Sequence, residues 1–308
     1  MRSYLVRRLG QSAVTLVGVS ILVFVILRVV PGDPAKMLLP EGAPQSAVDE
    51  LARQLGLREP LHVQYAIFLR SVFRGDFGHS FQYRAPALTV VVERLPATVH
   101  LTLAAMALTV AAGVSIGILA AVRQGTGYDY AGTTLAVLGQ SLPSFWLGIM
   151  FILLFGVTLR WLPTSGFQGW SHLVLPSVTL AAYPTALVAR LTRSSMLEIL
   201  GRDYIRTGRA KGLAERAVVL RHALRNATIP VLTVIGLQIG TLLGGAVITE
   251  SVFAWPGMGK LVVDAIFFRD FPVVQTILIL SASTFVAINL LVDVLYTFID
   301  PRIRYDTA

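Results

Sequence analysis

Apolar positions in this chain gather into six long stretches separated by polar segments. The stretches cover approximately residues 9–30, 99–122, 131–159, 173–191, 229–249 and 273–299. A helix of about 20 apolar residues is long enough to cross a hydrocarbon core of about 30 Å. The pattern therefore predicts an all-α polytopic membrane protein with six transmembrane helices and with both termini on the same side.

The first apolar stretch follows three arginines, Arg2, Arg7 and Arg8, an arrangement that is also found in signal peptides. A signal peptide has an apolar region of about 7 to 15 residues followed by a small-residue cleavage site. The stretch here is longer and ends in PGDPAK, which offers no such site. We therefore expect an uncleaved first transmembrane helix whose N-terminus is cytoplasmic.

The positive charge of the chain is concentrated on one predicted side of the membrane. Of the 308 residues, 55% are apolar and 14% are charged, and the formal net charge is +9. The predicted inner segments carry 15 basic against six acidic side chains, whereas the outer segments carry 11 basic against ten acidic ones. This positive-inside pattern predicts a multi-pass protein of the plasma (inner) membrane with cytoplasmic N- and C-termini. The excess charge therefore reflects topology and lipid contact, and we expect no nucleic acid partner.

Residue types that bind metals or nucleotides are few. The chain has no cysteine, and its five histidines are scattered without a His-x-x-x-His pair, so we expect no metal site. WPGMGK at residues 255–260 has neither the spacing of a phosphate-binding loop nor a strand before it. We therefore expect the chain to bind no cofactor and to be non-catalytic.

The outer segment 31–97 has the pattern of soluble helices. Ser46 and Asp49 have capping-box spacing before one amphipathic stretch that ends at Gly56, and a second stretch precedes RGDFG. The two predicted apolar stripes are Val48, Leu51 and Leu55, and Leu61, Tyr65, Phe68 and Val72. Two short helices that cover the outer mouth as a dock, lid or plug fit this pattern. Two helices that pack against each other or lie in the lipid interface fit it equally.

The loop between the fourth and fifth stretches, residues 192–228, is basic yet contains apolar residues at near-helical spacing. It predicts two short helices around a break at Gly212, because glycine costs about 1 kcal/mol in a helix interior relative to alanine. A basic helical elbow of this kind suits the docking of a soluble partner. An amphipathic segment on anionic headgroups explains the same pattern, and the residues by themselves leave both interpretations open.

Two segments of this loop resemble a known motif closely. Residues 203–213 read DYIRTGRAKGL, and residues 221–230 read RHALRNATIP. They are similar to the peptide and nickel variant of the EAA loop of ATP-binding-cassette (ABC) importer permeases, which reads like DYIRTARAKGL followed by RHALRNALLP. The general EAA pattern fits only at Gly212 and Leu224.

Further segments extend the resemblance along the chain. They are PGDP at 31–34, GDFG at 75–78, ERLPAT at 93–98, SLPSFWLG at 141–148 and GGAVITESVFAWPGMGKL at 244–261. The chain is identified as a member of the dipeptide/oligopeptide/nickel family of ABC importer permeases, as the subunit with the long outer insertion. The resemblance implies the type I importer fold, with the N-terminus and first helix at 1–30, an extracytoplasmic insertion at 31–97 and the permease core at 98–308.

The resemblance also implies partners and a mechanism. The expected partners are a second homologous permease, two ATP-binding-cassette subunits that bind ATP and Mg, and an extracytoplasmic substrate-binding protein. ATP-driven closure of the cassette subunits moves the coupling loop and switches a central cavity between outward and inward exposure. The implied substrates are di- or oligopeptides, and nickel, glutathione and haem are the alternatives.

Functional residues carry over from the family by their positions in the loop. The residues implied to form or support the contact with the ATP-hydrolysing subunit are Tyr204, Arg206, Gly208, Ala210, Lys211, Gly212, Leu213, His222, Arg225 and Asn226. A glycine at position 212 suits a sharp turn that also touches another protein closely.

Polar residues within the apolar stretches are candidates for the translocation pathway. They are Gln140, Gln238, Asn289 and Asp293. Polar groups at membrane depth face a bundle interior or a water path, and ordinary interhelical hydrogen bonding is the alternative explanation. Gly236, Gly240 and Gly244 recur every four residues on one face of the fifth stretch, which predicts close helix packing.

Two other classes of function are less well supported. Gly113, Ser115 and Gly117 spell the GxSxG sequence of a hydrolase, but they lie inside an apolar stretch without acid and histidine partners. Helix packing through small residues explains them better than an intramembrane hydrolase does. A stand-alone channel or secondary transporter is disfavoured because ionisable residues within the spans are nearly absent.

Overall fold

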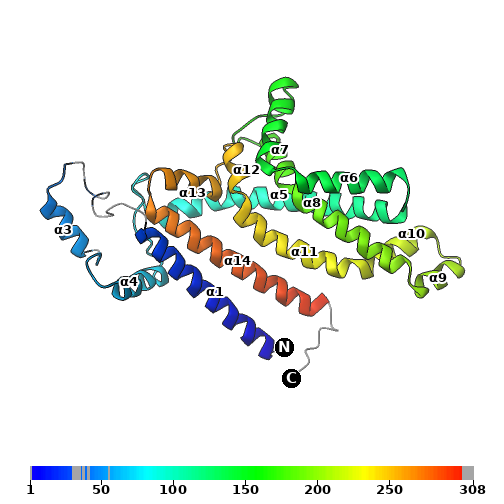
Figure 1. Cartoon of the computed structure of the whole chain (residues 1–308), viewed down its shortest axis with the longest axis horizontal. Helices are drawn as coiled ribbons and strands as arrows, with labels where there is room; N and C mark the ends of the chain where they lie inside the picture. Colours follow the sequence, from blue (N-terminus) through cyan, green and yellow to red (C-terminus); the bar gives the residue numbers. More distant parts are fainter. Residues whose placement is uncertain (1, 30–35, 37–38, 40–41, 55, 300–308) are drawn as a thin grey trace. The chain divides into compact units, whose positions relative to one another are not determined.

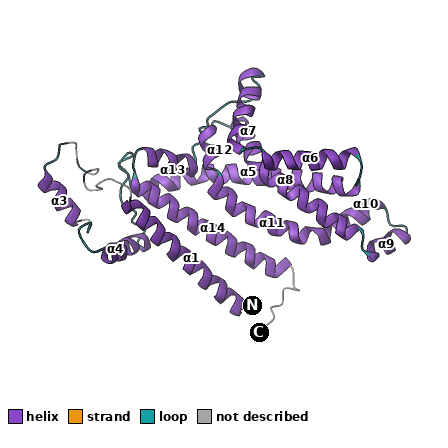
Figure 2. Cartoon of the chain, in the orientation of Figure 1, coloured by secondary structure: helices purple, strands orange, loops and turns teal. Residues whose placement is uncertain are grey.

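The structure of the chain is built from helices (Figure 2). It is a computed structural model, and it describes residues 2–29, 36, 39, 42–54 and 56–299. Within these residues the one β pairing is an isolated bridge between His79 and Pro86. The all-α fold predicted from the apolar pattern is therefore confirmed.

The chain divides into two compact units, which are described separately. The first comprises Met1–Pro96 and Leu261–Val286, and the second comprises Ala97–Lys260 and Ala287–Ala308. The first unit contains α1 (Arg2–Val29), α3 (Gln45–Gln54), α4 (Leu61–Phe73), the start of α5 (Ala87–Val122), the end of α13 (Met258–Phe267) and the first part of α14 (Phe271–Ile299) (Figure 1). The second unit contains the rest of α5, α6 (Gly127–Ser141), α7 (Ser144–Phe151), η1 (Ile152–Thr158), α8 (Trp170–Leu200), α9 (Asp203–Ala210), α10 (Glu215–Ala217), η2 (Val218–Ala223), α11 (Leu224–Gly245), α12 (Val247–Val252) and the end of α14.

Several helices are long and apolar enough to cross a membrane. Four do so singly within the described residues, and they are Arg7–Ile26, Ala87–Val122, Trp170–Leu200 and Phe271–Val292. Two bent pairs pass the same test, Gly127–Ser141 with Ser144–Thr158 and Glu215–Thr228 with Pro230–Gly244, with bends of 106° and 55°. Counted as one span each, the bent pairs bring the number to six, which agrees with the six predicted stretches.

The third predicted stretch, 131–159, is not one straight helix. α6 ends at Ser141 and α7 begins at Ser144, and Leu142 between them is extended with φ −82° and ψ 128°. Pro143 causes this break, because a proline disfavours the helical conformation of the residue before it and has no N–H to donate. The stretch continues as α7 and η1 after the bend.

The predicted apolar stripe of α4 packs on α1 in the first unit. The rings of Tyr65 and Phe68 lie near the ring of Phe24, with centroid separations of 5.2 and 5.8 Å. The Tyr65 hydroxyl also lies 2.8 Å from Ser20 Oγ, which is within hydrogen-bonding distance. Tyr65 and Phe68 therefore fix α4 against the first predicted transmembrane helix, whereas Leu61 of the same stripe is 65% exposed.

The apolar stripe of α3 packs against residues close to it in the sequence. Val48 and Ala52 are buried and contact Leu39 and Leu57. This small cluster holds α3 to its own flanking segments. The side chains of the other two predicted stripe residues, Leu51 and Leu55, lie outside the described part of the chain.

Small residues bring α5 and α8 close together in the second unit. A Cβ at Gly117 would lie 2.5 Å from Thr192 Cβ and 2.6 Å from the Ala189 carbonyl oxygen. A Cβ at Gly113 would lie 2.9 Å from a methyl carbon of Val188. Such approaches require residues without side chains at the interface. The GxSxG sequence that contains both glycines therefore serves helix packing, as predicted.

A buried ion pair ties α6 to α8. Asp129 lies in the first turn of α6 with 7% of its side chain exposed. Arg193 of α8 donates from Nε and Nη2 to the two carboxylate oxygens at 2.5 and 2.9 Å, and the Gly125 N–H donates to the same carboxylate at 3.0 Å. A bidentate pair of this kind adds geometric specificity to its energy. It therefore fixes the register of α6 against α8.

We expect Gly117→Ala to destabilise the protein, because the added methyl group meets Thr192 and the backbone of α8. Overpacking of this kind lowers the free energy of unfolding by about 1–3 kcal/mol. Gly18→Ala is the matched control, since a Cβ at Gly18 of α1 would meet nothing within 4 Å. Alanine there should be neutral or stabilising by up to about 1 kcal/mol. The midpoint of thermal unfolding in detergent measures both effects, and an unchanged midpoint for Gly117→Ala would contradict the described packing.

Candidate functional site

The segment between α8 and α11 folds as a short helix, a tight turn and a second helical stretch. α9 begins with Asp203, whose carboxylate suits the positive end of the helix dipole. After α9, Gly212 adopts φ +76°, and its N–H donates to the Arg209 carbonyl oxygen at 3.0 Å. This left-handed conformation favours glycine. The predicted break at Gly212 is therefore confirmed, and α10 begins at Glu215.

One isoleucine anchors α9 to the helices around it. Ile205 is 1% exposed and belongs to a buried apolar cluster at the ends of α5, α8 and α11. The other buried members are Ala121, Met196, Val218, Val219, Ala223 and Ala227. Full burial of an isoleucine side chain stabilises a structure by about 1.5–3 kcal/mol relative to its exposure. α9 is therefore packed as part of the second unit.

An ion pair braces the turn at Gly212. Arg209 donates from Nε and Nη2 to the two carboxylate oxygens of Glu215 at 3.1 and 2.6 Å. These hydrogen bonds raise the pKa of Arg209 above its ordinary value. Both side chains are about half exposed, so the pair adds little stability. Its effect is to set the direction of the two side chains across the turn.

A second contact joins the two halves of the loop motif. Asn226 donates from Nδ2 to the Tyr204 hydroxyl at 3.1 Å and to the His222 carbonyl oxygen at 2.9 Å. Tyr204 immediately precedes Ile205, the residue that anchors α9. The contact therefore holds the DYIRT part of the motif against the RHALRN part.

Most of the predicted coupling residues lie on the exposed surface of the segment between α8 and α11. Nine of the ten are exposed, and Gly208 is half-buried. The exposed residues are Tyr204, Arg206, Ala210, Lys211, Gly212, Leu213, His222, Arg225 and Asn226. A Cβ at Gly212 would meet nothing within 4 Å, so the turn leaves room for a close neighbour. We refer to these ten residues as the coupling surface.

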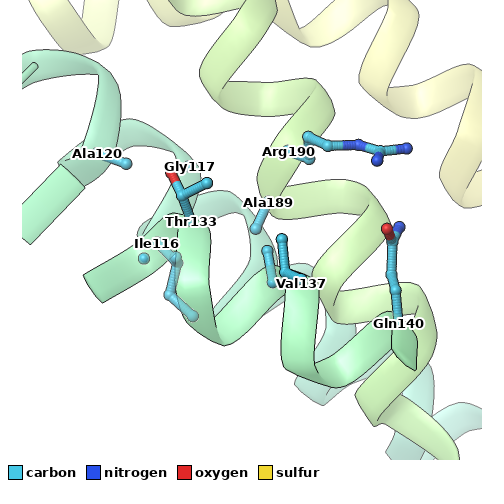
Figure 3. Close-up of a pocket in the computed structure, with 10 residues that line it drawn as sticks. Ile116, Gly117, Ala120, Thr133, Val137, Gln140, Ala189 and Arg190 are labelled. Atoms are coloured by element: carbon cyan, nitrogen blue, oxygen red, sulfur yellow. The ribbon is translucent and has the colours of Figure 1, made fainter. Parts of the chain in front are cut away.

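The predicted pathway residues lie on three different helices. Gln140, Gln238 and Asn289 are half-buried on α6, α11 and α14, and no hydrogen bond joins them within the described residues. The side chain of Asp293 lies outside the described part of the chain. Gln140 lies at the edge of a cavity between α5, α6 and α8, together with Arg190, which the apolar pattern does not single out (Figure 3).

The three glycines of α11 differ in how closely other residues approach them. A Cβ at Gly236 would lie 2.7 Å from a methyl carbon of Val292 on α14, and Gly240 is buried. A Cβ at Gly244 would meet nothing within 4 Å. The predicted close helix approach therefore occurs within this chain at Gly236.

A buried glutamate that the sequence did not indicate organises the segment before α13. Glu250 is fully buried and accepts hydrogen bonds from Thr98 Oγ1 at 2.7 Å and from the Lys260 N–H at 3.0 Å. Trp255 Nε1 donates to the Ala97 carbonyl oxygen at 2.8 Å. WPGMGK is therefore part of a buried structural contact with α5. An acidic residue at the end of an apolar stretch is the only signal that points to this role.

Two family models match most of the chain. The "Binding-protein-dependent transport system inner membrane component" model matches residues 113–305. The "Binding-prot-dependent transport system membrane comp, N-term" model matches residues 1–102. The two matches divide the chain between the first predicted stretch with its outer segment and the remaining core.

The relatives that match almost the whole of this chain include two permeases. The glutathione transport system permease protein GsiC of Salmonella choleraesuis is 46% identical over 305 residues, which cover 99% of this chain and 100% of GsiC. The dipeptide transport system permease protein DppB of Alkalihalophilus pseudofirmus is 41% identical, again over 99% of this chain and 100% of the relative.

Solved structures that share the fold include two ABC transporters. The MetNI methionine ABC transporter, in an inward-facing conformation, gives a TM-score of 0.59 at 20% identity over 69% of this chain and 97% of that chain. An amino acid ABC transporter with histidines gives 0.55 at 14% identity over 68% and 94%. Because one family model covers more than half of the chain and two permeases match it at full length, the chain belongs to the binding-protein-dependent transport system inner membrane component family, as a permease subunit of an ABC importer.

Proposed function

We propose that this permease imports short peptides, either di- or oligopeptides or glutathione, and that its loop 192–228 couples import to ATP hydrolysis on separate subunits. The observation that carries the proposal is the exposed coupling surface, which Ile205 ties to the ends of α5, α8 and α11. Close-packed interiors transmit displacement. A partner that moves the coupling surface therefore moves three membrane helices with it.

The proposed substrate class rests on the two relatives. One is a glutathione permease and the other is a dipeptide permease. Both named substrates are short peptides with free carboxylate groups and amide bonds. A pathway for such substrates must accept peptides with different side chains. Its polar groups must therefore bind the carboxylate groups and amide bonds that all of these peptides share.

The proposed assembly contains a second homologous permease, two ATP-binding-cassette subunits and an extracytoplasmic substrate-binding protein. ATP and Mg bind to the cassette subunits, and this chain is non-catalytic. Both termini and the coupling surface lie in the cytoplasm, in agreement with the positive charge of the loop. Substrate passes from the binding protein into a cavity between the two permeases.

Purification through a C-terminal tag from native membranes should recover a second permease and cassette ATPases together with this chain. The preparation should hydrolyse ATP, and a binding protein loaded with a dipeptide or glutathione should stimulate hydrolysis. Mass spectrometry of the co-purifying proteins and an ATPase assay measure this. Recovery of the folded chain alone, or ion-driven uptake by it, would contradict the proposal in favour of a channel or secondary transporter.

Gly212→Leu should leave the chain folded and assembled but uncouple ATP hydrolysis from uptake. A side chain in the left-handed conformation of Gly212 costs about 1–2 kcal/mol, and leucine also fills the space left for a partner. We expect uptake per ATP hydrolysed to fall by about tenfold or more, the size of effect expected when the contact with the ATPase is weakened by about 1.4 kcal/mol. Uptake and ATPase activity are measured together in proteoliposomes.

Gly212→Asn is the matched control for this variant. Asparagine adopts the left-handed conformation more readily than other residues with side chains, and it is smaller than leucine. It should therefore retain more uptake per ATP than Gly212→Leu at the same level of assembly. Normal coupling in Gly212→Leu would show that the turn does not contact the ATPase.

A further inference from the structure

A stripe of polar side chains runs along one exposed face of α8. Tyr183, Arg190 and Ser194 are separated by seven and four residues, so they share one face of the helix, and all three are exposed. α8 is also long and apolar enough to cross a membrane. At 1.5 Å per residue, Tyr183 lies about 10 Å along the helix axis from Arg190. The stripe therefore extends well into a membrane-spanning helix.

The polar groups of this stripe have no partner within the described residues. No hydrogen bond or ion pair joins the side chains of Tyr183, Arg190 or Ser194 to another described group. The neighbouring Arg193 uses both carboxylate oxygens of Asp129. Arg193 is thus neutralised within the chain, whereas Arg190 is available to bind a group from another molecule.

Gln140 extends the polar face onto a second helix. Figure 3 shows its amide and the Arg190 guanidinium on the same side of the α6–α8 pair. Both line a cavity whose other lining residues are apolar or small, among them Ile116, Ala136 and Ala189. Gln140 also lacks a hydrogen-bond partner in the described part of the chain.

Lipid is an unfavourable environment for this face. An arginine costs at least about 2.5–3.5 kcal/mol at the centre of a spanning helix, and the cost falls toward the ends of the helix, where Arg190 lies. Snorkelling to the headgroups would account for Arg190 alone, because it lies near the predicted inner end of its span. It does not account for Tyr183, which lies deeper in the span. It also does not account for Gln140, which lies in the last turn of α6, whereas Asp129 lies in the first turn. A polar face of this extent instead suits a water-filled path.

We propose that Arg190, with Gln140 on the same side of the α6–α8 pair and Tyr183 about 10 Å further along α8, forms a carboxylate-binding site on the wall of the translocation pathway. The ligand is the free carboxylate of a short peptide, so this inference rests on the function proposed above. A guanidinium offers two parallel N–H donors to the two carboxylate oxygens, and the phenol and amide supply further donors. The site binds the free carboxylate, which all peptides with an unblocked C-terminus share whatever their side chains.

The phosphate of an anionic lipid presents the same oxygen chemistry as a carboxylate. It would reach Arg190 from the membrane, whereas a peptide would reach it from the aqueous path. The two sources therefore differ in water access and in the compound that protects the site.

The lack of cysteine in this chain allows a direct test of water access. In the assembled transporter, Arg190→Cys and Ser194→Cys should react with a charged, membrane-impermeant thiol reagent much faster than Val14→Cys. Val14 is the matched control because it is 74% exposed on α1, another helix of spanning length. The mass increase of this chain measures labelling. Equally slow labelling at all three positions would show that the stripe is not in contact with water and would overturn the proposal.

Protection of Ser194→Cys from labelling identifies the ligand. The transporter is purified in detergent without its binding protein, so that added compounds reach the site directly. An excess of a dipeptide should slow labelling, and the same dipeptide with a C-terminal amide should not. Equal protection by both peptides, or by neither, would overturn the proposal. Protection by phosphatidylglycerol but not by the dipeptide, with phosphatidylcholine as the control, would assign the site to lipid phosphate and overturn it as well.

Uptake in proteoliposomes tests Arg190 itself. Arg190→Gln should lower uptake of a free-acid dipeptide by about 10- to 100-fold, the loss expected for a charged hydrogen bond. Arg190→Lys should restore part of this uptake, and Arg123→Gln, at an exposed arginine just after α5, should be neutral. Unchanged uptake in Arg190→Gln would overturn this site and leave peptide import intact. Absence of peptide uptake by the wild-type assembly would instead overturn the proposed function.

Discussion

Burial of Ile205 among the ends of α5, α8 and α11 is the contact on which the arrangement of the coupling surface depends. α9 has only eight residues, and isolated helices shorter than about 12–15 residues are marginal in water. Its stability must therefore come from packing. Because the buried face of α9 joins the apolar cluster, the charged face is presented outwards in a fixed orientation. The same short helix thus both anchors the loop, through Ile205, and exposes its charged side chains.

The contacts around this cluster decide which helices can move together. α5 and α8 approach closely at Gly117, and α6 is held to α8 by the pair between Asp129 and Arg193. Close packing and a bidentate ion pair both resist relative movement. The resulting block of helices runs from the coupling surface to the cavity edge that Gln140 and Arg190 line. A rigid element of this kind suits a transporter that turns movement of a partner into a change of cavity exposure.

Glu250 and Arg190 are two charged residues accommodated in different ways within a largely apolar chain. Glu250 is fully buried, and Thr98 and the Lys260 N–H satisfy its carboxylate, so its role is structural. Arg190 is exposed and has no partner in the described part of the chain. Its capacity to bind an anion is therefore available to another molecule. The two residues look alike in the sequence, since each is a single charge at the border of an apolar stretch.

The all-α fold, the six spanning segments, the break at Gly212 and the family can all be predicted from the amino-acid sequence. These features depend on local properties: the length of apolar stretches, the conformational freedom of glycine and the order of residues in a motif. The bend at Pro143 was also encoded locally, but the continuous apolar stretch around it obscured it. Two features depend instead on packing: Ile205 anchors the loop, and Arg193 rather than Arg190 forms the ion pair with Asp129. The reason is that Asp129 and Arg193 are 64 positions apart, and the choice between two arginines one helical turn from each other depends on how α6 packs against α8.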